Sequence, residues 1–145
     1  MVRITSQVIV VTQGRRDAGA MTDTSTAITT VVDDYLAAWN ERDDARRAEL
    51  IERAWAPDGR LIDPPFDGEG HDGISQMAAV MHEHYDGHSF ERTSGVDMHH
   101  QHARFAWKLV GPDGAVAVEG IDVANLAEDG RLARVVGFFG ELPAR

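Results

Sequence analysis

The hydrophobic pattern of the chain changes its period near Ser89, and this change constrains the fold more than any other feature. Before Ser89, most apolar residues recur every three or four positions, as in amphipathic helices; after it they alternate, as in half-buried strands. Two turn sequences, Gly111-Pro112-Asp113-Gly114 and Glu128-Asp129-Gly130, divide the alternating half into hairpins. Helices followed by antiparallel strands predict an α+β fold in which the helices cover one face of a curved sheet.

Three helices are predicted in the first half of the chain. The first follows the N-cap candidates Thr24-Ser25-Thr26, and its apolar stripe consists of Ile28, Val31, Val32, Tyr35, Leu36 and Trp39. The second is capped by Asp43 or Asp44, ends at Ala56-Pro57-Asp58-Gly59, and carries on one face Ala48, Ile51 and Trp55. The third begins near Asp72, and its apolar stripe consists of Ile74, Met77, Ala78, Met81 and Tyr85.

The strands are predicted from period-two alternation and from the turns between them. A short strand within residues 60–65 ends at Asp63, and residues 66–73 are predicted to be a loop. After Ser89, four strands are predicted at residues 90–98, 103–110, 115–126 and 131–139.

Length and composition fit one globular domain. The chain has 145 residues, of which 43% are hydrophobic and 26% charged. We assign the domain to residues 22–145 and treat residues 1–21 as a peripheral N-terminal segment. Its run Val8-Ile9-Val10-Val11 is too short for the core of a signal peptide, and no apolar run is long enough to span a membrane. The sequence therefore predicts a cytoplasmic protein.

The net charge and the absence of cysteine exclude several classes of partner. With 24 acidic and 14 basic residues, the formal charge of -10 argues against binding to nucleic acid or to an anionic membrane. Without cysteine there is neither a disulfide framework nor a thiolate metal site.

Asp63 ends the first predicted strand and directly precedes Pro64. The proline disfavours a helical backbone at Asp63, so the chain stays extended and Asp63 shares a face with Leu61. A carboxyl group on the apolar side of a strand end indicates a functional group. The alternative is a turn aspartate that begins the Pro64-Pro65-Phe66-Asp67-Gly68 loop, because aspartate is favoured in turns.

Asp122 and Tyr35 are two further polar residues at positions with apolar neighbours. Parity along residues 115–126 places Asp122 on a face whose other members are small or apolar, where an unpaired charge is costly. In the alternative, Asp122 faces solvent and the opposite face of the strand, with Ile121, is the core. Glu119 lies on that opposite face and argues against it as the core. Tyr35 lies on the apolar stripe of the first helix, where its hydroxyl needs a partner if it is buried; the alternative is an ordinary core tyrosine.

These residues, in this order, resemble the nuclear-transport-factor-2-like superfamily over residues 28–141. Within it the pattern is similar to ketosteroid isomerases, and parts of it recur in SnoaL-like polyketide cyclases. The matching segments are Asp34-Tyr35-Leu36-Ala37-Ala38-Trp39-Asn40, Ile62-Asp63-Pro64, Ile121-Asp122 and Gly137-Phe138-Phe139-Gly140. The resemblance implies a cystatin-like, cone-shaped α+β barrel, with three N-terminal helices on a curved, mostly antiparallel sheet, and a homodimer formed through that sheet.

The resemblance also implies roles for the site residues. Asp63 is expected to be a general base, while Tyr35 and a neutral Asp122 donate hydrogen bonds to a developing enolate. A neutral aspartic acid in this role is known from ketosteroid isomerases themselves, and an apolar cavity raises an aspartic acid's pKa. The expected lining of the substrate pocket consists of Trp39, Phe66, Val118, Gly120, Val135 and Phe139.

The sequence thus predicts a small enzyme that needs no cofactor and acts on an apolar carbonyl compound, by double-bond isomerisation or by cyclisation. The alternative is a non-catalytic, ligand-binding or structural dimeric domain of the same fold. Epoxide hydrolysis on this fold is disfavoured, because by family resemblance it uses an Arg-x-Asp pair and this chain has Arg104-Phe105-Ala106.

The histidines do not form a convincing metal site. His99, His100 and His102 gather around a predicted hairpin, but a metal site needs converging ligands and a second shell. We therefore expect an exposed cluster without a metal. His84 or His88 can project towards the cavity, and the sequence does not decide between them.

Overall fold

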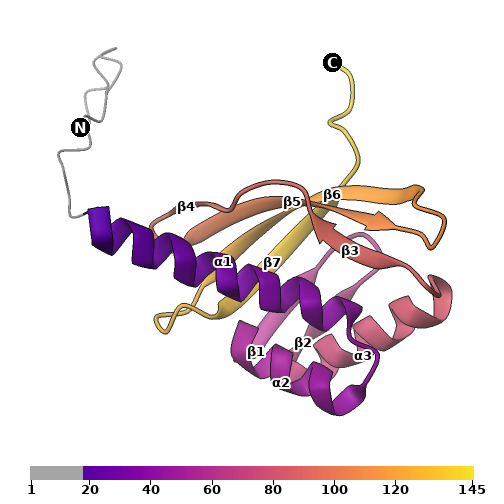
Figure 1. The fold of residues 1–145 in the computed structure, drawn as a ribbon, viewed down its shortest axis with the longest axis horizontal. Helices are drawn as coiled ribbons and strands as arrows, with labels where there is room; N and C mark the ends of the chain where they lie inside the picture. Colours follow the sequence, from indigo (N-terminus) through magenta and orange to yellow (C-terminus); the bar gives the residue numbers. More distant parts are fainter. Residues whose placement is uncertain (1–17) are drawn as a thin grey trace.

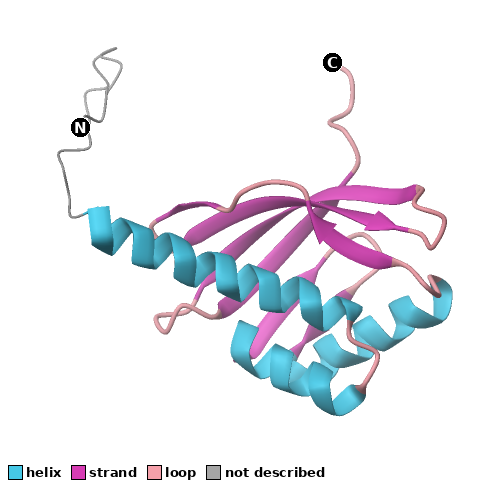
Figure 2. Ribbon diagram, viewed as in Figure 1, coloured by secondary structure: helices cyan, strands magenta, loops and turns pink. Residues whose placement is uncertain are grey.

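The computed structural model describes residues 18–145 as three helices and one seven-stranded sheet (Figures 1 and 2). The helices are α1 (Ala18–Asn40), α2 (Asp44–Ala54) and α3 (Gly70–His84). The strands are β1 (Trp55–Ile62), β2 (Asp67–Glu69), β3 (Ser89–Arg92), β4 (Asp97–His99), β5 (His102–Val110), β6 (Val116–Leu126) and β7 (Leu132–Phe139). The segment predicted to be peripheral, residues 1–21, lies outside this description except for its last four residues, which begin α1.

The strand order in the sheet is β2-β1-β7-β6-β5-β3, with β4 pairing beside β3 on β5. All neighbours are antiparallel except β1 and β7, which are parallel. The sheet is curved and does not close on itself, and the helices lie on one side of it (Figure 1). The predicted α+β cone is therefore confirmed. No helix in the described part of the chain is long and apolar enough to cross a membrane.

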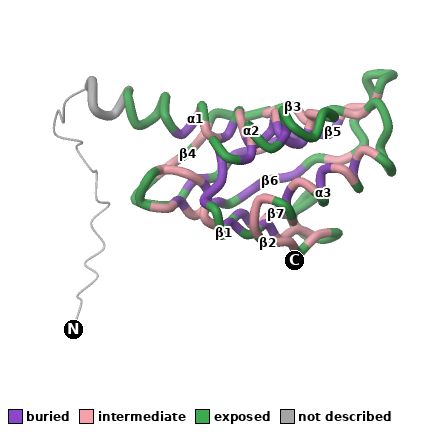
Figure 3. Tube along the Cα trace, turned by 90° about the horizontal axis from the view of Figure 1, so that it is seen from below, coloured by how far each residue is buried: buried purple, intermediate pink, exposed green. Residues whose placement is uncertain are grey.

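The core lies between α1 and the concave face of the sheet. Five of the six predicted stripe residues of α1 are buried, namely Ile28, Val32, Tyr35, Leu36 and Trp39. Figure 3 shows buried positions along α1 and β6. Alternate residues of β5 and β6 point to the same interior, so that Phe105 and Asp122, which face each other in register, are both buried. The predicted parity of β6, with Asp122 inward and Ile121 outward, is correct.

The start of α1 differs from the prediction. The helix begins at Ala18, upstream of the proposed caps Thr24-Ser25-Thr26, which therefore lie inside it. The hydroxyls of Thr29 and Thr30 donate to the carbonyls of Ser25 and Thr26 at 2.8 and 3.0 Å. Serine and threonine can bond to the carbonyl four residues earlier, so their presence does not require a helix end.

The second helix is capped as predicted but ends earlier. Asp43 is the N-cap, and its side chain accepts from the backbone N–H of Arg46 at 2.9 Å. The helix stops at Ala54, so the assignment of Trp55 to a helix face was wrong. Trp55 is extended and pairs with Leu132 of β7, and Pro57 would break any continuing helix.

Two boundaries in the middle of the chain also differ. The single strand predicted over residues 90–98 is two strands, β3 and β4, and both pair with β5. Between them the exposed Ser94 pairs with β5 through its side chain, because its hydroxyl accepts from the backbone N–H of Ala106 at 2.8 Å. The predicted loop over residues 66–73 contains β2 and the first turn of α3.

Candidate active site

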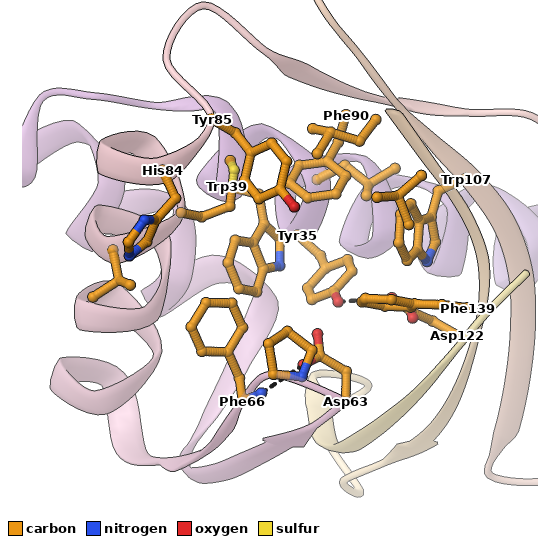
Figure 4. Close-up of a pocket in the computed structure, with 16 residues that line it drawn as sticks. Tyr35, Trp39, Asp63, Phe66, His84, Tyr85, Phe90, Trp107, Asp122 and Phe139 are labelled. Carbon is orange, nitrogen blue, oxygen red and sulfur yellow. Dashed lines mark hydrogen bonds between the residues drawn. The ribbon is translucent and has the colours of Figure 1, made fainter. Parts of the chain in front are cut away.

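An apolar cavity of about 650 Å³ lies between α1, α3 and the concave face of the sheet (Figure 4). All three residues with predicted catalytic roles, Tyr35, Asp63 and Asp122, line it. Four of the residues expected to bind substrate also line it, namely Trp39, Phe66, Val118 and Phe139. A helix, the end of β1 and the middle of β6 thus bring three polar side chains to one apolar space.

Gly120 and Val135 do not line the cavity, although both were expected to. Val135 is fully buried in β7, where it pairs with Leu61 and Ala124. Gly120 does face inward, but the indole of Trp107 covers it: a Cβ at Gly120 would lie 2.4 Å from Cζ2 of that ring. Gly120 therefore makes room for a lining side chain rather than touching a ligand.

Tyr35 and Asp122 form a buried hydrogen-bonded pair. The Tyr35 hydroxyl donates to Oδ2 of Asp122 at 2.7 Å, and the two residues are only 3% and 4% exposed. Edge-to-face contacts with Trp55 and Phe105, at 5.7 and 5.8 Å between ring centroids, fix the tyrosine ring. The partner that the sequence requires for a buried Tyr35 is therefore Asp122.

Burial dominates the electrostatics of this pair. It raises the pKa of Asp122 to about 6, against the opposing effect of the hydrogen bond from Tyr35. Burial and the charge of Asp122 also raise the pKa of Tyr35 well above its ordinary value, so the tyrosine keeps its proton. When Asp122 is neutral, both groups carry a hydrogen that can be donated.

Asp63 directly follows β1 and is half-buried, with its carboxyl turned towards the Tyr35 hydroxyl (Figure 4). Its Oδ1 accepts from the backbone N–H of Phe66 at 2.9 Å, and the Asp63 N–H donates to the Phe66 carbonyl at 2.9 Å. Burial raises the pKa of Asp63 to about 6, and the Phe66 N–H lowers it. The two interpretations of Asp63 are compatible, because the residue begins the turn and also lines the cavity.

Gly137 lies between the side chains of Asp63 and Asp122, and this role in the site was not predicted from the sequence. It pairs with Asp122 across β6 and β7. A Cβ at this position would lie 2.9 Å from Oδ1 of Asp122 and 3.0 Å from Cβ of Asp63. The missing side chain therefore allows Asp63 and Asp122 to approach the same space.

Much of the apolar lining was not predicted from the sequence. The additional lining residues are Leu36, Pro65, Val80, Met81, Tyr85, Phe90, Trp107 and Leu109. Trp107 and Leu109 alternate on the inner face of β5, and that parity was the available signal. His84, one of two candidates, also lines the cavity.

The histidine cluster lies away from the cavity. The Nδ1 atoms of His99 and His100 are 3.2 Å apart at the exposed turn between β4 and β5. Within residues 18–145, no group of three or more histidine and acidic side chains is arranged to hold a metal ion.

The comparisons with known proteins identify the family. A solved SnoaL-like family protein from Agrobacterium tumefaciens, proposed to be an isomerase, is 40% identical to this chain. The match covers 80% of this chain and 99% of that one, with a TM-score of 0.75. The chain therefore belongs to the SnoaL-like family.

More distant structures share the fold alone. A protein of unknown function with a cystatin-like fold from Methylobium petroleophilum is 16% identical, with a TM-score of 0.67 over 83% of this chain and 80% of that one. A ketosteroid-isomerase-like fold from Catenulispora acidiphila, solved with trimethylamine, is 15% identical, with a TM-score of 0.61 over 74% and 83%. No family model matches the chain, and neither does any curated protein.

Proposed function

We propose that this protein is a cofactor-free acid/base enzyme that shifts a double bond in a small apolar carbonyl compound. The observation that carries the proposal is the meeting of Asp63 with the Tyr35–Asp122 pair in one apolar cavity. Isomerisation beside a carbonyl needs one group that removes and returns a proton, and donors for the oxygen on which negative charge develops. Asp63 suits the first task, and Tyr35 with neutral Asp122 suits the second.

In the proposed reaction, Asp63 removes a proton from the carbon next to the carbonyl group. The electrons of that C–H bond form the enolate, whose oxygen receives hydrogen bonds from Tyr35 and Asp122. Asp63 then returns the proton to a carbon further along the conjugated system, so the isomer forms with no net gain or loss of atoms. Base catalysis of this kind is typically worth about 10²–10⁴-fold.

Two other activities fit parts of the same site. A polyketide-cyclase-like reaction also begins with an enolate, so it needs the same base and the same donors. A domain that only binds an apolar ligand needs the cavity but no proton transfer. The test below separates catalysis from binding.

The test measures deuterium incorporation next to the carbonyl group of bound cyclic enones and steroid-like ketones in D₂O, by NMR. Asp63→Asn keeps the shape of the side chain and removes the base, so exchange is expected to fall by about 10²–10⁴-fold while ligand affinity changes little. The matched control is Asp67→Asn, which alters a nearby exposed carboxylate paired with Arg60. Equal exchange in wild type and Asp63→Asn would remove Asp63 as the base. Binding without any exchange would favour the ligand-binding domain.

We also propose that the protein forms a homodimer through the outer face of its sheet. Ile121, Val123 and Phe138 are apolar, point away from the core, and are 49%, 39% and 63% exposed. Ile121 lies opposite Phe138 in the ladder, so these side chains form one continuous patch. Contiguous exposed apolar surface on a sheet marks an interaction site, and a second copy offers the same apolar patch.

A further inference from the structure

The indole N–H of Trp107 is a buried donor that has no hydrogen-bond partner among the described residues. Trp107 is 5% exposed and lines the cavity beside the Tyr35–Asp122 pair. Nearly all buried N–H groups in folded proteins are paired, so an unpaired one facing a cavity calls for a specific explanation. A ligand atom that accepts a hydrogen bond would satisfy it.

The position of this indole is fixed by its neighbours. Phe90 and Phe139 contact it edge to face, with ring centroids 5.3 and 5.4 Å away. Gly120 lies directly opposite Trp107 in the ladder, and the indole fills the space that any side chain there would need. The N–H is therefore held in place in advance, without a partner at hydrogen-bond geometry among the described residues.

The N–H is close to the proposed oxyanion site. The indole N–H lies near enough to Asp122 to lower the pKa of that carboxyl as a hydrogen-bond donor, against the larger effect of burial, but its geometry falls short of a hydrogen bond. Figure 4 shows the indole nitrogen on the edge of the ring that faces Asp122 and Phe139. Oδ2 of Asp122 already accepts from Tyr35. An acceptor atom placed next to Asp122 can therefore receive the hydrogens of neutral Asp122 and of Trp107, and Tyr35 becomes a third donor when its hydroxyl turns from Asp122 to that atom.

We propose that Trp107 is a third hydrogen-bond donor to the ligand oxygen, beside Tyr35 and neutral Asp122. This deepens the proposed function, because it specifies what the cavity selects. An indole N–H only donates and does not titrate in the physiological range. The end of the cavity near Trp107 therefore accepts a carbonyl, enolate or phenol oxygen and disfavours a group that only donates, such as a protonated amine.

The first test is spectroscopic and uses the full chain. The protein has three tryptophans, so a ¹⁵N-labelled sample should give three indole N–H signals, and Trp107→Phe assigns one of them by its loss. Adding 2-naphthol, a planar phenol, should move the Trp107 indole proton strongly downfield. Naphthalene has the same rings without the oxygen and should leave that shift nearly unchanged. The buried Trp55 serves as the internal reference.

The second test measures binding and turnover. Trp107→Phe should weaken 2-naphthol binding by about tenfold more than it weakens naphthalene binding, because both ligands lose apolar contact with the indole but only 2-naphthol loses a hydrogen bond. With an enone substrate, kcat should fall more than KM rises, because the donor acts mainly on the developing charge. Thermal unfolding of Trp107→Phe checks that the fold is intact.

The outcomes separate this inference from the proposed function. An unmoved Trp107 signal in a protein saturated with 2-naphthol would overturn the donor assignment, as would equal 2-naphthol affinity in wild type and Trp107→Phe. A shifted Trp107 signal in a protein that exchanges no ketone proton would support the donor and overturn the enzyme. Should Trp107→Phe fail to fold, the wild-type response to the two ligands still decides the question.

Discussion

The burial of Asp122 predicts that its replacement by asparagine affects stability by an amount that depends on pH. Asp122 is 4% exposed, and burial raises its pKa from 3.8 to about 6. A group whose pKa is raised by folding stabilises the protein fully below its unfolded pKa, and this contribution is lost as the pH rises through the folded value. The wild type should lose this contribution between about pH 4 and pH 8.

The magnitude follows from the two pKa values. One unit corresponds to about 1.4 kcal/mol, so a rise from 3.8 to about 6 corresponds to about 3 kcal/mol. Asparagine does not ionise, so Asp122→Asn avoids this loss. The stability of Asp122→Asn relative to wild type should therefore be about 3 kcal/mol greater at pH 8 than at pH 4.

Urea denaturation of both proteins at both pH values, at one fixed protein concentration, measures this difference. The comparison across pH cancels the constant effect of the substitution and, to first order, the titration of Asp63, which both proteins contain. Asp67→Asn is the control. Pairing with Arg60 lowers the pKa of Asp67, so the stability of Asp67→Asn relative to wild type should fall as the pH rises. If the Asp122→Asn difference were equal at both pH values, burial would not raise the pKa of Asp122, and the proposed neutral donor would lose its support.

Three further predictions concern the dimer, a helix cap and the spacing of the site. Phe138→Glu places a charge on the apolar outer face and should convert a dimer to a monomer in light scattering; a monomeric wild type would contradict the proposal. Asp43→Ala removes the N-cap of α2 and should lower the free energy of unfolding by about 1 kcal/mol in urea; an unchanged midpoint would show that the cap contributes nothing. Gly137→Ala should slow deuterium exchange by roughly 10²-fold, because its methyl group would displace Asp63 or Asp122, and full activity would show that their spacing is not critical.

The fold was predictable from the sequence wherever periodicity was long and clean. The stripe of α1 and the parity of β6 were assigned correctly because one period held over many residues. The assignment failed at Trp55, where the decisive contact is with Leu132 in β7, far away in the chain. The local sequence pattern does not show such a pairing, so the second helix was predicted to continue past Ala54.

The polar residues of the site were predictable for a different reason. Tyr35, Asp63 and Asp122 each occupy a position whose neighbours are apolar, and family resemblance added their order. Trp107 gave no such signal, because a tryptophan that alternates with outward-facing residues has the pattern of an ordinary core side chain. Only the structure shows that its N–H is left without a partner in the described part of the chain.

Two glycines explain why the spacing of the site escaped the sequence. A glycine inside a strand weakens the strand, and it often marks a site where another group approaches the backbone closely. In the structure, Gly120 leaves the space that the Trp107 indole fills, and Gly137 leaves the space between Asp122 and Asp63. Both face the helices from neighbouring strands, Gly137 in register with Asp122 and Gly120 in register with Trp107. The base and the donors are thus side chains that can be identified in the sequence, whereas the distances between them depend on the absence of a side chain at Gly120 and Gly137.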